Sequence, residues 1–407
     1  MRERAEIVNR VLETRLDTIL PIAMREAGID MWLILCQEDN LDPVFTTLVP
    51  FDTWCPILQM LVFYDTGDTV ERINLSGTNT YNLYDRPIAT QLSEEQWPKL
   101  IEVIQARDPQ RIGINVGAVQ WAGGGLTHNL YTQLVDRLPA PYQERLVSAE
   151  VAATRWLATL TDEDVVLHEH AVGVARAVIA ECYSSRGVIP GVTTTTELEW
   201  YFWQTVTDLG LEVSFRPFFS IVRCSENRER FGETDHVIRP GDLVHCDVGV
   251  KYLRLNTDHQ QWAYILRPGE KRAPEGLKRL MAEANRLQEI FMSEFQAGLT
   301  GNELLNNILT RAQADRVPNP RVYSHSLGYF LHEPGPLIGL PWEQVRCPGR
   351  GDVKLEPNYA FAMELSVRAP VPEWGGPEVT LSIEEDVIFT REGCRVLDGR
   401  QTEFYCV

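Results

Sequence analysis

Two hydrophobic patterns alternate along the first 150 residues. Residues 31–36, 57–64 and 111–116 are short apolar runs of the kind that form buried strands. Residues 3–19 and 93–107 instead repeat their apolar positions at helical spacing. Pro21 is expected to end the first of these helices, and Ser93 to cap the second. The alternation predicts an α/β domain.

The pattern changes to longer helices after residue 160. Helices are expected near 161–185, 196–209, 275–295 and 300–314, and Thr300 with Glu303 forms a capping box for the last. Strand-like runs separate and follow them at 215–222, 242–250, 261–266, 359–367 and 381–390. This order favours helices covering one face of a mostly antiparallel sheet, an α+β domain. The predicted domains are therefore 1–152 and 153–407.

The amino-acid composition indicates a soluble protein and limits the kinds of partner that it can bind. Hydrophobic residues make up 44% and charged residues 23% of the 407, which is typical of a soluble globular chain. The net charge of −19, without a basic run, argues against nucleic acid or a membrane surface as the main partner. The charged start and the lack of a long apolar stretch predict a cytoplasmic protein. The eight scattered cysteines are expected to be reduced and mostly buried.

The stretch HCDVGVKYLRLNTDHQQW, residues 245–262, reads as a hairpin that contains two aspartates. A reversal near Tyr252 and Leu253 would place Asp247 opposite Asp258. Their Cβ atoms would then lie about 5 Å apart, and the two carboxylates would repel each other. His245 shares a strand face with Asp247, where it either supports a ligand or is simply packed and hydrogen-bonded. Cys246 faces the opposite side and is expected in the core.

More ionisable residues stand in the later strands. Glu364 and Glu384 lie in apolar runs, where an unpaired carboxylate is costly, and His325 lies in a loop-flanked segment between the helices and these strands. Each acid alone could be a cap, a turn residue or a solvent-facing side chain. Considered as a set with the two aspartates, they are harder to explain as separate structural residues, because the sequence offers few nearby cationic side chains to pair with them.

The order and spacing of this set resemble the pita-bread metallopeptidase family, which includes methionine aminopeptidase, aminopeptidase P, prolidase and creatinase-like proteins. Two aspartates stand eleven residues apart, a His-x-x-Gly segment follows with a second histidine seven residues after the first, and two glutamates come later. GDLVHCDVG is also similar to the family's lead-in to the first aspartate. The resemblance covers about residues 155–395, and the layout is nearest to Xaa-Pro aminopeptidases and prolidases. The matching residues are Asp247, Asp258, His325, His332, Glu364 and Glu384.

The resemblance implies a pita-bread catalytic domain preceded by a creatinase-type α/β domain. It implies two divalent ions, with Asp247 on one, His325 on the other, and Asp258 and Glu384 bridging them. Manganese, cobalt, iron and zinc all suit such an oxygen-rich site with one nitrogen. Glu364 would be a further ligand and would move the proton of the water that bridges the ions.

The implied function is a dinuclear exopeptidase that hydrolyses the N-terminal bond of short peptides, with Xaa-Pro as one option. His332 would bind the substrate carbonyl or the developing oxyanion. A homodimer is also implied.

The sequence departs from the family around the metal set. Family peptidases carry a substrate-binding histidine about seventeen residues before the first aspartate, where this chain has Arg230. Arg230 could bind a substrate carboxylate or be a solvated loop residue, and His236 could take the histidine's place. Gln260 and Gln261 replace the usual Thr-Arg pair, and Leu365 replaces a proline. These changes affect the substrate prediction more than the metal prediction.

Two alternatives remain open at this point. A creatinase-type hydrolase of a non-peptide amide or amidino substrate works without metal, so the intact ligand set counts against it. A non-catalytic binding protein on the same fold would be expected to lose ligands or gain basic surface, and this chain does neither.

Overall fold

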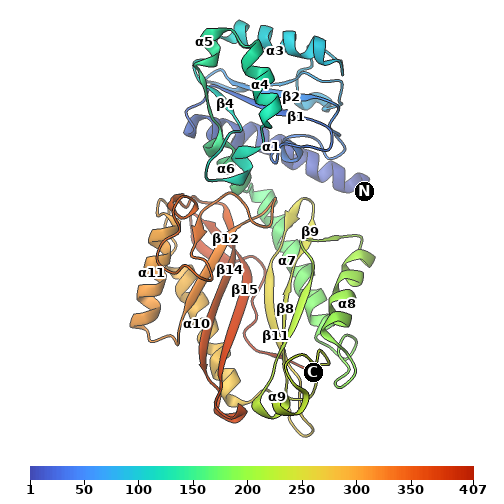
Figure 1. Cartoon of the computed structure of the whole chain (residues 1–407), viewed down its shortest axis with the longest axis vertical. Helices are drawn as coiled ribbons and strands as arrows, with labels where there is room; N and C mark the ends of the chain where they lie inside the picture. Colours follow the sequence, from blue (N-terminus) through green and yellow to red (C-terminus); the bar gives the residue numbers. More distant parts are fainter. The chain divides into compact units, whose positions relative to one another are not determined.

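The computed structural model describes residues 1–407, which form two compact units, Met1–Thr161 and Asp162–Val407 (Figure 1). The boundary predicted after residue 152 falls inside helix α6 (Glu150–Ala158). This helix packs against α1 (Arg2–Glu26) and so belongs to the first unit. None of the helices combines the length and the apolar character needed to cross a membrane.

The first unit is built on a five-stranded mixed sheet in the order β3-β2-β1-β4-β5. The central strand β1 pairs antiparallel with β2 and parallel with β4. Alternate residues of β1 share a hydrophobic cluster with α3 and α4, which explains the apolar strand runs. The strands are β1 (Met31–Cys36), β2 (Gln59–Asp65), β3 (Val70–Asn74), β4 (Ile112–Ile114) and β5 (Leu146–Ser148). The remaining helices are α2 (Phe45–Leu48), α3 (Ser93–Arg107), α4 (His128–Arg137) and α5 (Ala140–Gln143).

Two predicted helix ends in this unit are wrong. Helix α1 continues through Pro21 to Glu26. Leu20, Ala23 and Met24 are fully buried on either side of the proline. Their burial outweighs the roughly 3 kcal/mol that an interior proline costs. Ser93 is the first residue inside α3 rather than its cap.

The second unit holds a nine-stranded sheet whose main path is β13-β12-β14-β15-β11-β8-β7. All of its pairings are antiparallel except that of β17 with β11. A small sheet, β10-β9-β6, extends the hairpin. The strands are β6 (Glu212–Val213), β7 (Phe218–Val222), β8 (Leu243–Val248), β9 (Val250–Tyr252), β10 (Leu255–Asn256), β11 (His259–Tyr264), β12 (Arg321–Leu327), β13 (Leu337–Ile338), β14 (Tyr359–Pro370), β15 (Glu378–Thr390), β16 (Gly393–Val396) and β17 (Tyr405–Cys406).

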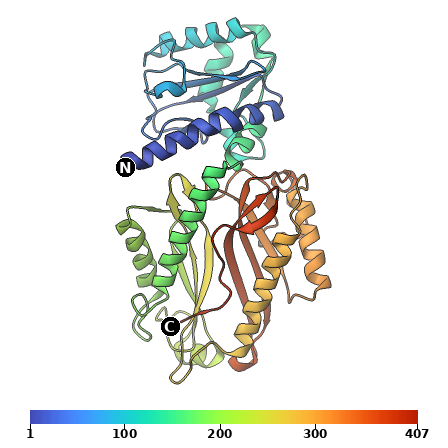
Figure 2. The same cartoon turned by 180° about the vertical axis from the view of Figure 1, so that it is seen from behind.

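Long helices cover one face of this sheet, as Figure 2 shows for α7 and α10. Cys246 and Val248 of β8 pack in one buried cluster with residues of α7 and α8. Side chains alternate along a strand, so His245 and Asp247 point to the opposite face. The helices are α7 (Asp162–Cys182), α8 (Thr195–Asp208), α9 (Ser225–Phe231), α10 (Glu275–Ser293) and α11 (Gly301–Ala314). The predicted α+β class, the Thr300 capping box and the core position of Cys246 are confirmed.

The hairpin register differs from the prediction by two residues. Leu253 and Arg254 form the turn with positive φ angles of 51° and 73°, and Tyr252 pairs with Leu255. This shift places Gln260 opposite Asp247 and leaves Asp258 just before β11. Gly249 makes the hairpin possible, because a Cβ there would lie 2.0 Å from the Thr257 carbonyl oxygen.

All eight cysteines are free thiols, and six of them are buried.

Candidate metal centre

A row of polar side chains crosses the face of the sheet that the helices leave open. Gln260 of β11 pairs with Asp247 of β8 on one side and with Glu384 of β15 on the other. Glu384 in turn pairs with Glu364 of β14, and Glu364 with Tyr323 of β12. Because lateral partners project from the same face of a sheet, antiparallel pairing alone brings these groups together.

Three of the predicted ligands form the tightest group. Asp258, His325 and Glu384 each offer a ligand atom, and these atoms lie within 4.8 Å of one another. The His325 Nε2 atom is 3.6 Å from Asp258 Oδ2. All three side chains are buried.

His325 is oriented to use its Nε2 lone pair toward this group. Its Nδ1 lies 3.1 Å from the Ser326 carbonyl oxygen, which can only accept, so Nδ1 carries the proton. Burial lowers the pKa of His325 to about 4, which keeps the imidazole neutral. Asn256 fastens the loop after His325 by donating from Nδ2 to the carbonyls of Gly328 and Tyr329. That contact ties the histidine segment to the chain just before Asp258.

The carboxylates repel one another in the absence of a cation. Burial and the charge of Asp258 raise the pKa of Asp247 to about 7. Burial raises the pKa of Asp258 to about 8. Burial, with the charges of Asp258 and Asp247, raises the pKa of Glu364 to about 8 and that of Glu384 well above its usual range. Asp247 and Asp258 are not strand partners, yet the repulsion inferred from the sequence is present.

Gln260 stands at the middle of the row. Its Nε2 donates to Glu364 Oε1 and to Glu384 Oε2, both at 2.8 Å. Its Oε1 lies 3.0 Å from His245 Nε2. His245 is therefore packed and hydrogen-bonded, and its partner Gln260 is not one of the five predicted ligands.

His332, Tyr323 and Arg350 border the centre. The His332 ring is exposed and lies 4.5 Å from the His325 ring. Burial and the nearby charges of Glu364 and Glu384 raise the pKa of the Tyr323 phenol. Tyr323 is two residues from His325 on the same strand, so strand alternation could have revealed it.

Arg350, at the start of a short 3₁₀ helix (Arg350–Asp352), was not predicted from the sequence. Its Nη2 donates to the Glu333 carbonyl at 2.9 Å, and its buried Nε has no hydrogen-bond partner. Burial is the main cause of the low pKa of His325, and the positive charge of Arg350 lowers it further. No acidic side chain pairs with it. A long loop brings Arg350 here, so no local sequence pattern marks it.

Arg230 and His236, the predicted substrate-binding candidates, lie in the connection between β7 and β8. Both side chains are exposed, and the Arg230 guanidinium lies over the Phe231 ring. Figure 1 shows α9, which carries Arg230, at the end of β8 far from β9, whereas Asp247 lies near β9. No hydrogen bond or ion pair links either side chain to the metal set.

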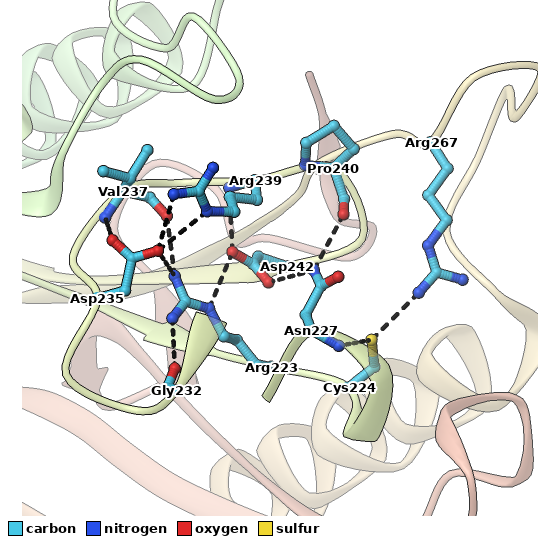
Figure 3. Close-up of polar contacts among 10 residues, drawn as sticks. All are labelled: Arg223, Cys224, Asn227, Gly232, Asp235, Val237, Arg239, Pro240, Asp242 and Arg267. Atoms are coloured by element: carbon cyan, nitrogen blue, oxygen red, sulfur yellow. Dashed lines mark hydrogen bonds and ion pairs between the residues drawn. The ribbon is translucent and has the colours of Figure 1, made fainter. Parts of the chain in front are cut away.

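A buried network fixes the shape of this connection (Figure 3). Arg223 donates to the carbonyls of Gly232 and Val237 and lies 3.4 Å from Asp242 Oδ2. Asn227 Nδ2 donates to Asp242 Oδ1 at 2.7 Å. The backbone around Arg230 and His236 is thus held from inside.

A second buried polar cluster supports Asp258. The Asp258 backbone N–H donates to the Asp386 carboxylate, and His259 Nδ1 lies 3.3 Å from Glu385 Oε2. His168 of α7 lies 2.7 Å from the Asn256 carbonyl oxygen through its Nε2. His259 had no predicted role, and these contacts place it among groups that hold the segment carrying Asp258.

The donor set fits a divalent cation. Asp258 Oδ1 and Glu384 Oε1 are buried and have no hydrogen-bond partner. Buried carboxylate oxygens are normally paired or bound to metal, and the two residues that carry these oxygens form one group of ligand atoms with His325. Two oxygens and one nitrogen at this spacing are suitable ligands for manganese, cobalt, iron or zinc.

Comparison with known proteins agrees with this geometry. The family model described as metallopeptidase family M24 matches residues 167–391, more than half of the chain. An Xaa-Pro dipeptidase of Pyrococcus furiosus is 23% identical over 193 residues, which are 46% of this chain and 49% of that protein. The chain thus aligns with about half the length of this curated relative.

Solved structures share the fold over nearly the whole chain. An X-Pro aminopeptidase from Thermotoga maritima has a TM-score of 0.66 at 16% identity, covering 95% of this chain and 100% of that one. An Xaa-Pro dipeptidase from Bacillus anthracis has a TM-score of 0.63 at 18% identity, covering 98% and 100%. The N-terminal domain of the FACT complex subunit SPT16 from chickpea has a TM-score of 0.61 at 11% identity, covering 97% and 98%.

These matches confirm the resemblance and the pita-bread fold that were inferred from the sequence. The chain belongs to metallopeptidase family M24.

Proposed function

We propose that this chain is a divalent-metal-dependent exopeptidase that hydrolyses the N-terminal bond of short peptides, with Xaa-Pro substrates as the first class to test. The observation that carries the proposal is the convergence of Asp258, His325 and Glu384 on one buried point, with two carboxylate oxygens unpaired. Asp247 and Glu364 flank that point in the same row. The names of the curated relative and of two structural neighbours support the substrate class.

Each side chain has a role that its position suits. Asp247, Asp258, His325, Glu364 and Glu384 are the proposed ligands, for two ions in the full site. A divalent ion in such a site acidifies water and polarises a carbonyl group. Glu364, with its raised pKa, would take up and return the proton of the attacking water. His332, exposed beside His325, would donate a hydrogen bond to the substrate carbonyl oxygen.

The competing functions have less support. A creatinase-type hydrolase does not need the five ligands that this chain keeps. The fold alone does not decide between enzyme and binding protein, since the SPT16 domain shares it and is not named as a peptidase. The unpaired buried oxygens of Asp258 and Glu384 favour a metal enzyme. The homodimer and the cytoplasmic location stay predictions.

The test combines metal analysis with substrate screening. We expect protein purified without chelator to contain divalent metal, and manganese or cobalt to restore activity after chelation. Xaa-Pro dipeptides and tripeptides, Xaa-Ala analogues and non-peptide amides should be compared in one assay. Protein with no stoichiometric metal and no metal-stimulated cleavage would refute the proposal, and cleavage restricted to non-peptide amides would favour the creatinase type.

Arg350 is the proposed contact for the C-terminal carboxylate of a short peptide. A guanidinium without an acidic partner, beside His325 and His332, is suited to pair with that carboxylate. We expect Arg350→Ala to raise KM for dipeptides by roughly tenfold to a hundredfold, the worth of one charged hydrogen bond. C-terminally amidated peptides should be affected much less.

Arg346→Ala is the matched control for this test, because Arg346 is exposed and pairs with Asp352 nearby. Steady-state kinetics on free and amidated peptides measure the difference. Equal losses on both substrate forms would show that Arg350 does not bind the carboxylate.

A further inference from the structure

We infer that the Gln260 amide takes the place of one of two cations, so that the centre binds a first ion tightly and a second only when this side chain moves away. The inference rests on the proposed metal-dependent function and adds a specific order of loading.

Gln260 makes the contacts that a cation would make. It lies between Asp247 and Glu384 in the row across the sheet. Its Nε2 carries two N–H donors, and these reach Glu364 Oε1 and Glu384 Oε2, each at 2.8 Å. The amide therefore binds one oxygen of each glutamate and partly neutralises their repulsion.

His245 fixes which end of the amide faces the carboxylates. The Gln260 oxygen can only accept, so His245 Nε2 carries the proton and donates to Gln260 Oε1 over 3.0 Å. The ring of Trp262 packs 4.6 Å from the His245 ring and keeps it in place. With the oxygen held by His245, the nitrogen must point at Glu364 and Glu384.

The two halves of the centre are consequently unequal. Asp258 and Glu384, which form one group of ligand atoms with His325, each keep a buried oxygen without a hydrogen-bond partner, so this half can accept an ion. On the Asp247 side, the amide already holds Glu384 Oε2. A second ion there must displace two hydrogen bonds to charged groups, which weakens its binding by at least about a hundredfold.

The position of Gln260 in the sequence makes this blocking of the second ion specific to this chain. Gln260 follows Asp258 by two residues, where the related peptidases commonly have threonine. A threonine side chain is too short to reach both glutamates from β11. Gln260→Thr should therefore release the second position without touching any of the five proposed ligands.

The test is a titration of the metal-free protein with manganese. Calorimetry measures the two Kd values, and electron paramagnetic resonance shows whether the bound ions are isolated or coupled. For the wild type we expect two binding steps whose Kd values differ by about a hundredfold or more. Its spectrum at one equivalent should be that of an isolated ion. Gln260→Thr should bring the two Kd values within about tenfold of each other and give the spectrum of a coupled ion pair at two equivalents.

Gln261→Asn is the matched control, because Gln261 lies on the same strand but donates to Glu385 at 2.9 Å, away from the row. It should titrate like the wild type, and circular dichroism should show that both variants fold. Two steps of equal affinity in the wild type, or an unchanged gap in Gln260→Thr, would overturn the inference while leaving the proposed function intact. Failure of every protein to bind manganese would overturn both.

Discussion

Replacing Glu364 with glutamine is expected to lower kcat for peptide hydrolysis by about a thousandfold, in the range measured for lost general acid–base groups. Glutamine keeps the shape of the side chain and an oxygen that can accept from Gln260 Nε2, but it cannot carry a proton. It also removes one of the charges that raise the pKa values of the neighbouring acids. The melting temperature of the metal-free variant should therefore equal or exceed that of the wild type.

Glu378→Gln is the control for this prediction. Glu378 begins β15, the strand that carries Glu384, but it is exposed and pairs with Arg368. Its replacement should leave both kcat and melting temperature nearly unchanged. Single-turnover assays with equal metal loading separate a lost proton transfer from lost metal. Turnover within tenfold of wild type in Glu364→Gln would contradict the assigned role.

Removing the metal is expected to make stability fall steeply as pH rises. The pKa values of Asp247, Asp258 and Glu364 lie near 7 to 8 in the folded protein, well above those of unfolded acids. Between about pH 4 and pH 8 the folded state therefore binds more protons than the unfolded state, and its free energy of unfolding declines with pH. One acid raised by three pKa units accounts for roughly 4 kcal/mol.

Saturating manganese should reverse this slope, because metal binding needs the deprotonated carboxylates and stabilises the folded state more at higher pH. Urea denaturation at pH 5, 6.5 and 8, with chelator or with manganese, measures the effect. Glu364→Gln should flatten part of the metal-free profile. A metal-free protein equally stable across this range would mean that the acids are better solvated than their burial indicates.

Asp247, Glu364 and Glu384 were predictable because each lies within its own strand. The interval from Asp247 to Asp258 and the positions of Glu364 and Glu384 in apolar strands follow directly from the sequence. Antiparallel pairing then brings these three into one row through Gln260. Asp258 and His325 were added to the set by the spacing of the family motif. Alternation also placed Cys246 in the core correctly.

What could not be predicted depends on contacts between distant segments. The turn at Leu253 and Arg254 uses positive φ angles that neither residue type favours, so the register shifted by two. Pro21 stays helical only because the residues around it are buried. Arg350 reaches the centre from a loop. The sequence shows Gln260 as a departure from the family pattern, but its hydrogen-bond partners Glu364 and Glu384 lie on other strands and could not be read from it.

The connection between β7 and β8 has one practical consequence. Its shape is set by Arg223, Asn227 and Asp242, which are buried, whereas Arg230 and His236 project outward. Because the buried residues hold the backbone from inside, we expect substitutions at Arg230 and His236 to leave the shape of the segment unchanged. In protein engineering, the exposed positions of this connection are therefore suitable sites for introducing new side chains.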